Sequence, residues 1–162
     1  MKEDLSVFDN IIYYLENEGL EYDLLEHDHV HSSEQAARVR GTSLEEAAKA
    51  LVLQGKKNDE KKYFMCVVSG HKRLDLKKIK EVTGFPNVSL ASPEKVLELT
   101  GLEVGKIPPF PFLFDLDGYV DKGVLENEYV CFSAASNFKS VRMRSKEWRV
   151  IASVPDKDIA KS

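Results

Sequence analysis

The sequence predicts an α+β domain in which a mixed, curved β-sheet is surrounded by helices. Apolar residues recur at helical spacing near the N-terminus, and apolar runs of strand length follow in the middle of the chain. The second half holds several further short runs of the same kind. With 162 residues, 43% apolar and 31% charged, the chain fits one domain over residues 1–162 with a single sizeable core.

The composition indicates in which cellular compartment the protein works and which partners it lacks. No apolar run approaches the roughly 20 residues of a membrane span, and the N-terminus lacks the apolar stretch of a signal peptide. Cys66 and Cys131 each lie inside an apolar run, which indicates buried free thiols in a reducing compartment. A catalytic cysteine has less support, because neither run has a nearby histidine. We therefore expect a cytoplasmic protein without a membrane partner.

The charge is unevenly distributed. A net charge of −4 argues against a general nucleic-acid binder, and DNA is not an expected partner. Residues 71–80 and 139–149 are nevertheless rich in lysine and arginine. Such segments can hold a phosphate backbone, although they can equally be ordinary solvated faces. The candidate phosphate contacts are Lys72, Arg73, Lys77, Lys78, Arg142 and Arg144.

The first forty residues predict a helix, a strand and a second helix. Leu5, Phe8 and Leu15 follow a helical period that ends near Gly19, and residues 20–25 favour a strand. A second capped helix then begins at Ser32, with Gln35 three residues later, and ends at Gly41.

Three histidines, His27, His29 and His31, follow the predicted strand. In an extended segment they share one face, which raises the possibility of a metal site. The chain offers no clear further ligand, so we favour a polar strand end and expect no metal and no other cofactor.

The stretch around Lys49 is the centre of the functional prediction. Ser43 and Glu46 form a capping box, which predicts a short helical turn over residues 44–48. The apolar run over residues 50–53 predicts a buried strand. Lys49 is therefore expected at a helix-to-strand junction, where its stem is held close to the backbone. The alternative is an ordinary solvated lysine.

Capping and turn residues divide the rest of the chain into further elements. The expected elements before residue 101 are a strand over 63–68 that pairs with 50–53 as a hairpin, a helix from Asp75 to Gly84, a strand over 88–90 and a helix from Ser92 to Gly101. The later elements are expected to be strands over 110–114, 118–120, 129–132, 139–143 and 148–152. Val141 and Met143 alternate with Arg142 and Arg144, which predicts a half-buried strand with a basic outer face.

The loop from Gly101 to Pro109 combines flexibility with stiffness. Gly101 and Gly105 permit unusual backbone dihedrals, and Pro108 and Pro109 then restrict them. A loop that is both bent and rigid is suited to presenting backbone N–H groups to a ligand carbonyl. The alternative is a structural connector of the same composition.

Five landmarks occur in order along the chain. They are Val30-x-Ser32-x-Glu34-x-Ala36-Ala37, Ala47-Ala48-Lys49-Ala50-Leu51-Val52, Arg73-Leu74-Asp75 before a lysine-rich helix, Gly101-x-x-x-Gly105-x-x-x-Pro109, and Asp121. In this order and spacing they resemble the YbaK/prolyl-tRNA-synthetase-associated family of aminoacyl-tRNA deacylases. The resemblance runs from about Leu20 to Val154.

The resemblance implies a YbaK-like, barrel-like fold and a freestanding trans-editing deacylase. Such a hydrolase cleaves the ester of a mischarged tRNA, here of the tRNA(Pro) type, with no metal and no protein nucleophile. Lys49 is the implied catalytic residue. The implied substrate-binding residues are Ser32, Gly101, Gly105, Ile107, Pro108, Pro109, Ala135, Ser136 and Asn137. The implied partners are aminoacyl-tRNA, contacted by the basic residues above, and prolyl-tRNA synthetase or another synthetase.

Two positions depart from the pattern of the family. Many members have an Ala-Gly pair, sometimes followed by a histidine, where this chain has Ala134-Ala135-Ser136-Asn137. The methyl group of Ala135 and the amide of Asn137 bear on the choice of substrate. They also leave open an alternative, a non-catalytic tRNA-binding or synthetase-associated adaptor with the same fold.

Overall fold

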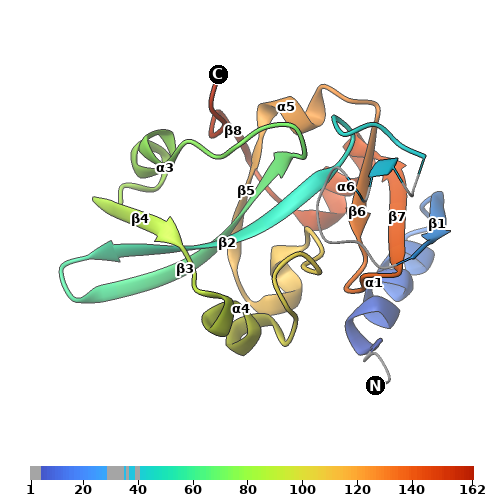
Figure 1. Ribbon diagram of the computed structural model, residues 1–162, viewed down its shortest axis with the longest axis horizontal. Coiled ribbons are helices and arrows are strands. Elements are labelled where there is room, and N and C mark those ends of the chain that lie inside the picture. The colour runs from blue at the N-terminus through green and yellow to red at the C-terminus, as the bar shows by residue number, and fades with distance from the viewer. Residues whose placement is uncertain (1–4, 29–34, 36, 39–40) are drawn as a thin grey trace.

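The computed structural model describes residues 5–28, 35, 37–38 and 41–162, which form two β-sheets with helices packed around them (Figure 1). The helices are α1 (Ser6–Asn17), α3 (Leu76–Thr83), α4 (Pro93–Thr100), the 3-10 helix η1 (Pro111–Phe114), α5 (Lys122–Leu125) and α6 (Ser145–Ala152). The strands are β1 (Tyr22–Glu26), β2 (Ala48–Lys57), β3 (Glu60–Ser69), β4 (Asn87–Leu90), β5 (Asp117–Asp121), β6 (Tyr129–Ser133), β7 (Lys139–Arg144) and β8 (Asp156–Lys157). None of the helices in the described ranges is long and apolar enough to cross a membrane.

The two sheets differ in size and pairing. The larger has the order β4-β2-β3-β5-β8, with antiparallel pairs on the β4 side and parallel pairs of β5 with β3 and with β8. The smaller has the order β1-β7-β6 and is antiparallel. The α+β class and the mixed pairing are therefore confirmed. Instead of one barrel-like sheet, the described strands form two sheets.

Strand β2 leads from the smaller sheet into the larger one (Figure 1). Its antiparallel hairpin with β3 confirms the predicted pairing and sets Lys49 opposite Val68. Just before β2, Ala47 forms a parallel bridge with Cys131 of β6. The Cys131 N–H also donates to the Glu46 carbonyl at 2.9 Å. The start of β2 is thus held by both sheets.

The larger sheet separates two hydrophobic cores. Side chains alternate along β2, so that Ala48, Ala50 and Val52 face a large core, which also contains residues of α1, α4 and α6. Leu53 faces a smaller core. Helix α3 and the C-terminal residues cover that smaller core through Ile79 and Ile159, both 0% exposed.

The helix caps expected from the sequence are present. The Asp75 carboxylate accepts from the N–H groups of Lys77 and Lys78 at the start of α3, at 3.0 and 3.3 Å. Ser92 accepts from the Lys95 N–H at the start of α4, at 3.2 Å. Left-handed glycines end both helices, as predicted.

Two expected strands are wrong. Residues 110–114 contain the 3-10 helix η1, because Pro111 cannot donate to a strand ladder and suits a first helical position. Residues 148–152 belong to α6, in which Trp148 and Ala152 are buried four residues apart. The β-branched pair Val150-Ile151 favours a strand locally, but Val150 is 80% exposed and does not contribute to the core.

The expected helical turn before Lys49 is also corrected. A turn covers residues 44–46 only, and β2 begins at Ala48, so Lys49 is the second residue of a strand rather than a junction residue. The Glu46 N–H donates to Ser43 Oγ at 3.3 Å. The Glu46 carboxylate binds Arg142 instead, so it does not complete the capping box. The helix expected between Ser32 and Gly41 lies largely outside the described residues.

Candidate functional site

The Lys49 side chain projects from β2 on the side of the smaller core. It is half-buried, and its cross-strand neighbour Val68 belongs to that core. Its ammonium donates to the Lys72 backbone carbonyl at 3.3 Å. An ammonium has three donors, and the described residues provide this one acceptor. Two donors thus remain for a ligand.

The environment of Lys49 also changes its protonation. Burial, and then the positive charge of Arg73, lowers the pKa of Lys49 from the ordinary lysine value of 10.5. A cation with reduced solvation attracts a ligand oxygen more strongly than a fully hydrated one. The lowered pKa and the free donors therefore favour a binding or catalytic role over an ordinary solvated lysine.

The turn after β3 packs closely against the segment before β2. The Gly70 N–H donates to the Ala47 carbonyl at 2.9 Å, and a Cβ at Gly70 would lie 2.9 Å from the Leu44 carbonyl oxygen. Only glycine fits here, because the two backbones are in contact. The adjacent Ser69 is 0% exposed, and its hydroxyl has no hydrogen-bond partner among the described residues. The sequence carried no signal that singled out Ser69.

The Gly101–Pro109 loop is held in place at its C-terminal end. Gly101 and Gly105 have φ values of +75° and +94°, as their role in bending the chain requires. Ile107 is buried in the large core, and the Trp148 indole donates to the Pro109 carbonyl at 3.0 Å. Ile107 and the Lys49 side chain consequently belong to opposite faces of β2. The described contacts do not bring the ammonium onto this loop.

The segment from Ala134 to Asn137 turns between β6 and β7. Ala134 and Ala135 are buried in the large core, and Ala135 has a φ of +60°, a conformation that favours glycine. Ser136 is also buried, and its hydroxyl accepts from the Phe138 N–H at 2.9 Å. The Ala135 methyl therefore packs in the core. Ser32, the other predicted substrate contact, lies outside the described residues.

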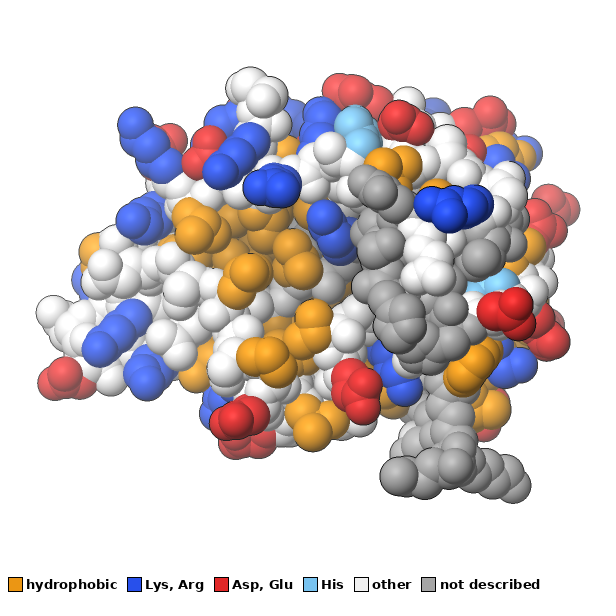
Figure 2. All heavy atoms as spheres, viewed as in Figure 1, with side chains coloured by type: hydrophobic (Ala, Val, Ile, Leu, Met, Phe, Trp, Pro, Cys, Tyr) orange, Lys and Arg blue, Asp and Glu red, His pale blue; other side chains and the backbone are white. Residues whose placement is uncertain are grey.

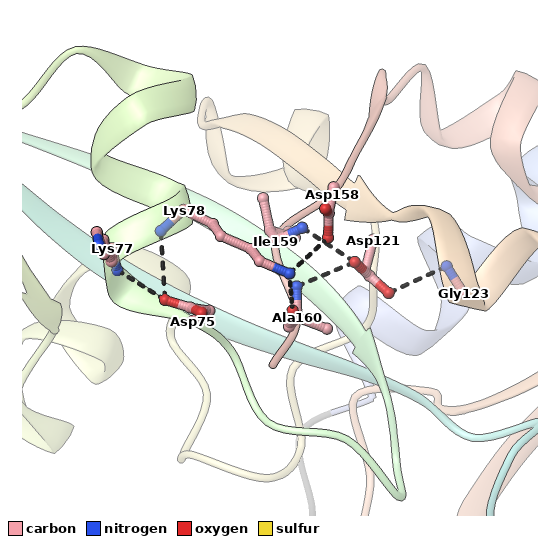
Figure 3. A network of polar contacts seen from close by, with 8 residues as sticks. All are labelled: Asp75, Lys77, Lys78, Asp121, Gly123, Asp158, Ile159 and Ala160. Carbon is pink, nitrogen blue, oxygen red and sulfur yellow. Dashed lines mark hydrogen bonds and ion pairs between the residues drawn. The ribbon is translucent and has the colours of Figure 1, made fainter. Parts of the chain in front are cut away.

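Half of the predicted phosphate contacts already have acidic partners. The Arg142 guanidinium binds the Glu46 carboxylate through Nε and Nη2, at 3.1 and 3.0 Å, and lies over the Tyr129 ring. Arg144 pairs with Glu128 at 3.2 Å. Lys78 donates to Asp158 and to the Ala160 carbonyl, at 3.0 and 2.8 Å (Figure 3).

The other three basic residues have no acidic partner within the described ranges. Arg73 and Lys77 are exposed, and Lys72 is half-buried. They lie at the start of α3 or just before it, and Figure 2 shows lysine and arginine side chains gathered around that helix. This side of α3 is better suited to a polyanion than the surface of β7, where the basic side chains are paired.

Of the three histidines in the predicted cluster, the structure describes only His27. One ring nitrogen lies 2.7 Å from Ser140 Oγ and the other lies 2.8 Å from the Asp28 carbonyl oxygen. Within the described ranges no group of three or more His, Cys, Asp or Glu residues could hold a metal ion. His29 and His31 lie outside these ranges, so the expectation of a metal-free site stays a prediction.

A cavity lies away from Lys49. It has a volume of about 690 Å³ and lies between α1, η1 and α6, where Tyr14, Phe112 and Val150 form part of its lining. Its walls are largely apolar, and none of the predicted site residues lines it.

Comparisons with known proteins give one consistent family. A family model described as an aminoacyl-tRNA editing domain matches residues 27–151. The multifunctional Ser/Thr-tRNA deacylase ProXp-y of Escherichia coli (strain K12) is 33% identical over 143 residues, which cover 88% of this chain and 86% of that protein. The prolyl-tRNA editing protein ProX of Acetoanaerobium sticklandii is 25% identical over 112 residues, 69% of this chain and 67% of that protein. A crystal structure of a hypothetical protein superposes with a TM-score of 0.82 at 25% identity and covers 93% of this chain and 99% of that one.

The burial of Lys49 and the nearby charge of Arg73 predict that its ammonium loses its proton at a lower pH than an ordinary lysine. In an NMR titration of ¹³C-methylated lysines, Lys49 should lose its proton at lower pH than Lys62, because burial and Arg73 lower the pKa of Lys49 while a hydrogen bond with Asp117 raises that of Lys62. Arg73→Gln should move the Lys49 midpoint upward and leave Lys62 unchanged. If Lys49 titrates with or above Lys62, its ammonium is as well solvated as any surface lysine.

Proposed function

This chain belongs to the aminoacyl-tRNA editing domain family, and on that premise we propose that it is a freestanding trans-editing deacylase that hydrolyses the ester of mischarged tRNA. The deacylase and editing activities in the names of its relatives support this proposal. A tRNA(Pro)-type substrate is the narrower part of the proposal and is supported by the similarity to a prolyl-tRNA editing protein. Because another relative is named a Ser/Thr-tRNA deacylase, seryl- and threonyl-tRNA belong in any substrate panel.

The observation that carries the proposal is the half-buried Lys49 ammonium beside an unpaired edge of β2. Strand β4 pairs with β2 only over Leu53–Lys56, and the Val52 carbonyl accepts from the Ala91 N–H at 3.0 Å. Backbone groups alternate in direction along a strand, so those of Ala50 point to the same edge as those of Val52. Within the described ranges no strand pairs with Ala50 on that edge.

This edge offers a way for the two faces of β2 to act on one substrate. We place the aminoacyl ester at the edge, where Lys49 reaches it from the side of the smaller core. The Gly101–Pro109 loop reaches it from the side of the large core. The backbone N–H of Ala50 then adds a donor between them. The loop and Lys49 need not touch each other to share a ligand bound there.

The chemistry required of these groups is modest. An aminoacyl ester is already activated, so hydrolysis by water needs positioning of the ester and stabilisation of the developing oxyanion more than a covalent intermediate. The Lys49 ammonium can donate to the carbonyl oxygen as negative charge develops on it, and this charge-assisted hydrogen bond strengthens toward the transition state. No protein nucleophile is needed for this route.

Replacing Lys49 tests the proposal directly. Lys49→Ala should lower the single-turnover deacylation rate by about a hundredfold or more, the scale seen on removal of one oxyanion donor. Lys49→Arg should also fail, because a planar guanidinium is wider than an ammonium. Thermal melting should change little, since Lys49 is not part of either core. Lys57→Ala, at the exposed end of the same strand, is the matched control and should hydrolyse at the wild-type rate.

A panel of labelled aminoacyl-tRNAs gives the readout for these variants. Several turnovers per molecule by the wild type support an enzyme. Tight tRNA binding without turnover would instead favour the adaptor. Normal melting together with wild-type hydrolysis by Lys49→Ala would refute the role of Lys49.

Variants of two neighbouring lysines in α3 should separate an effect on tRNA binding from an effect on folding. Lys77→Ala should weaken tRNA binding and reduce its salt slope by about one, because Lys77 is exposed and without an acidic partner among the described residues. Its melting temperature and its hydrolysis of a minimal aminoacyl-adenosine should not change. Lys78→Ala should lower the melting temperature, because Lys78 holds Asp158 and the Ala160 carbonyl. Equal effects of both variants on tRNA binding would contradict this division.

A further inference from the structure

We propose that Asp121 is a positioning residue for the Lys49 site. Its buried carboxylate holds the C-terminal segment, residues 158–161, against residues 72–75, and these residues present the Lys72 carbonyl to the Lys49 ammonium. The inference rests on the proposed function to the extent that Lys49 is the reactive group. Figure 3 shows the hydrogen bonds of Asp121 that would connect it to the site in this way.

Asp121 connects three parts of the chain. It ends β5, it is 3% exposed, and its Oδ2 accepts from the Gly123 N–H at 3.0 Å at the start of α5. Its Oδ1 accepts from the N–H groups of Ile159 and Ala160, both at 3.0 Å. Figure 3 shows the carboxylate between these two groups of donors. Three charge-assisted hydrogen bonds satisfy the buried carboxylate, which explains why a charge is tolerated here.

The C-terminal segment in turn fixes the chain that follows β3. The Asp75 N–H donates to the Ile159 carbonyl and the Lys161 N–H donates to the Arg73 carbonyl, both at 2.8 Å. Between them Leu74 and Ala160 form an antiparallel bridge. Residues 73–75 therefore behave as a short strand whose partner is held in place by Asp121.

Lys72 is the link between this strand and the site. Its carbonyl accepts from the Lys49 ammonium at 3.3 Å, and its N–H donates to the Ser69 carbonyl at 3.0 Å. Its own ammonium lies next to Gly123, since a Cβ built there would be 3.0 Å from Lys72 Nζ and 2.9 Å from Asp121 Oδ2. The Lys72 side chain thus lies beside Gly123, which binds Asp121, and its backbone directly precedes the residues that the C-terminal segment holds. Loss of the carboxylate should release the carbonyl that orients Lys49.

Asp121→Asn tests the proposal with little change in shape. The amide cannot accept all three N–H groups, because one of its two ends is a donor. We expect kcat for deacylation to fall about tenfold, since a small misplacement of a reacting group is costly, while KM stays within about twofold. Amide exchange at Asp75 and Lys161 should accelerate, and the ¹³C-methyl-lysine signal of Lys49 should shift.

Two controls separate positioning from loss of stability. Leu15→Ala, in the large core and remote from residues 72–75, should lower the melting temperature without altering kcat or the Lys49 signal. Asp117→Asn, at the exposed other end of β5, should leave the Lys49 signal and kcat unchanged. If Asp121→Asn folds poorly, Lys161→Pro serves as a second variant. It removes the N–H that binds the Arg73 carbonyl, leaves the Asp121 carboxylate in place, and should lower kcat by about threefold.

The outcomes distinguish this inference from the proposed function. A fall in kcat no larger than that of a Leu15→Ala variant with the same loss of melting temperature overturns the positioning role. An unchanged Lys49 signal in both Asp121→Asn and Lys161→Pro overturns it as well. If the wild type hydrolyses no aminoacyl-tRNA, the proposed function fails, but the exchange and NMR measurements still decide whether Asp121 positions Lys49.

Discussion

The register between β2 and β3 is the constraint on which the rest of this structure depends. It sets Lys49 opposite Val68 and directs Ala48 and Ala50 into the large core. Because side chains alternate strictly along a strand, a slip of one residue would drive the ammonium into that core and expose the alanines. Burying an unpaired charge there would cost far more than the hairpin could recover. The buried alanines on either side of the lysine thus fix the face of β2 on which it lies.

Much of the fold could be predicted because its signals are local. The caps at Asp75 and Ser92, the glycines that end α3 and α4, and the β2–β3 hairpin all follow from neighbouring residues. Local signals failed where tertiary packing decided, as in α6, where burial of Trp148 outweighs a β-branched pair. They failed again before β2, where Glu46 pairs with a residue 96 positions away rather than closing its own helix turn.

For the candidate site, the sequence likewise showed which segments contribute residues but not where those residues lie in the fold. The landmarks around Lys49 and from Gly101 to Pro109 were visible in the sequence, but the face of β2 that each occupies depends on register. Nothing in the sequence showed that Lys78 and Arg142 are held by acidic partners while Lys77 is exposed. Long-range pairs of this kind decide which cations remain for a polyanion, and only the folded chain brings them together.

A structure with a non-hydrolysable substrate mimic tests the central claim most directly. An adenosine whose 3′-oxygen is replaced by an amide-linked amino acid keeps the carbonyl but resists hydrolysis. We expect this carbonyl to lie within hydrogen-bond distance of Lys49 Nζ, beside the unpaired edge of β2 at Ala50. Binding of the mimic in the cavity between α1, η1 and α6, or anywhere out of reach of Lys49, would contradict the proposed role of Lys49.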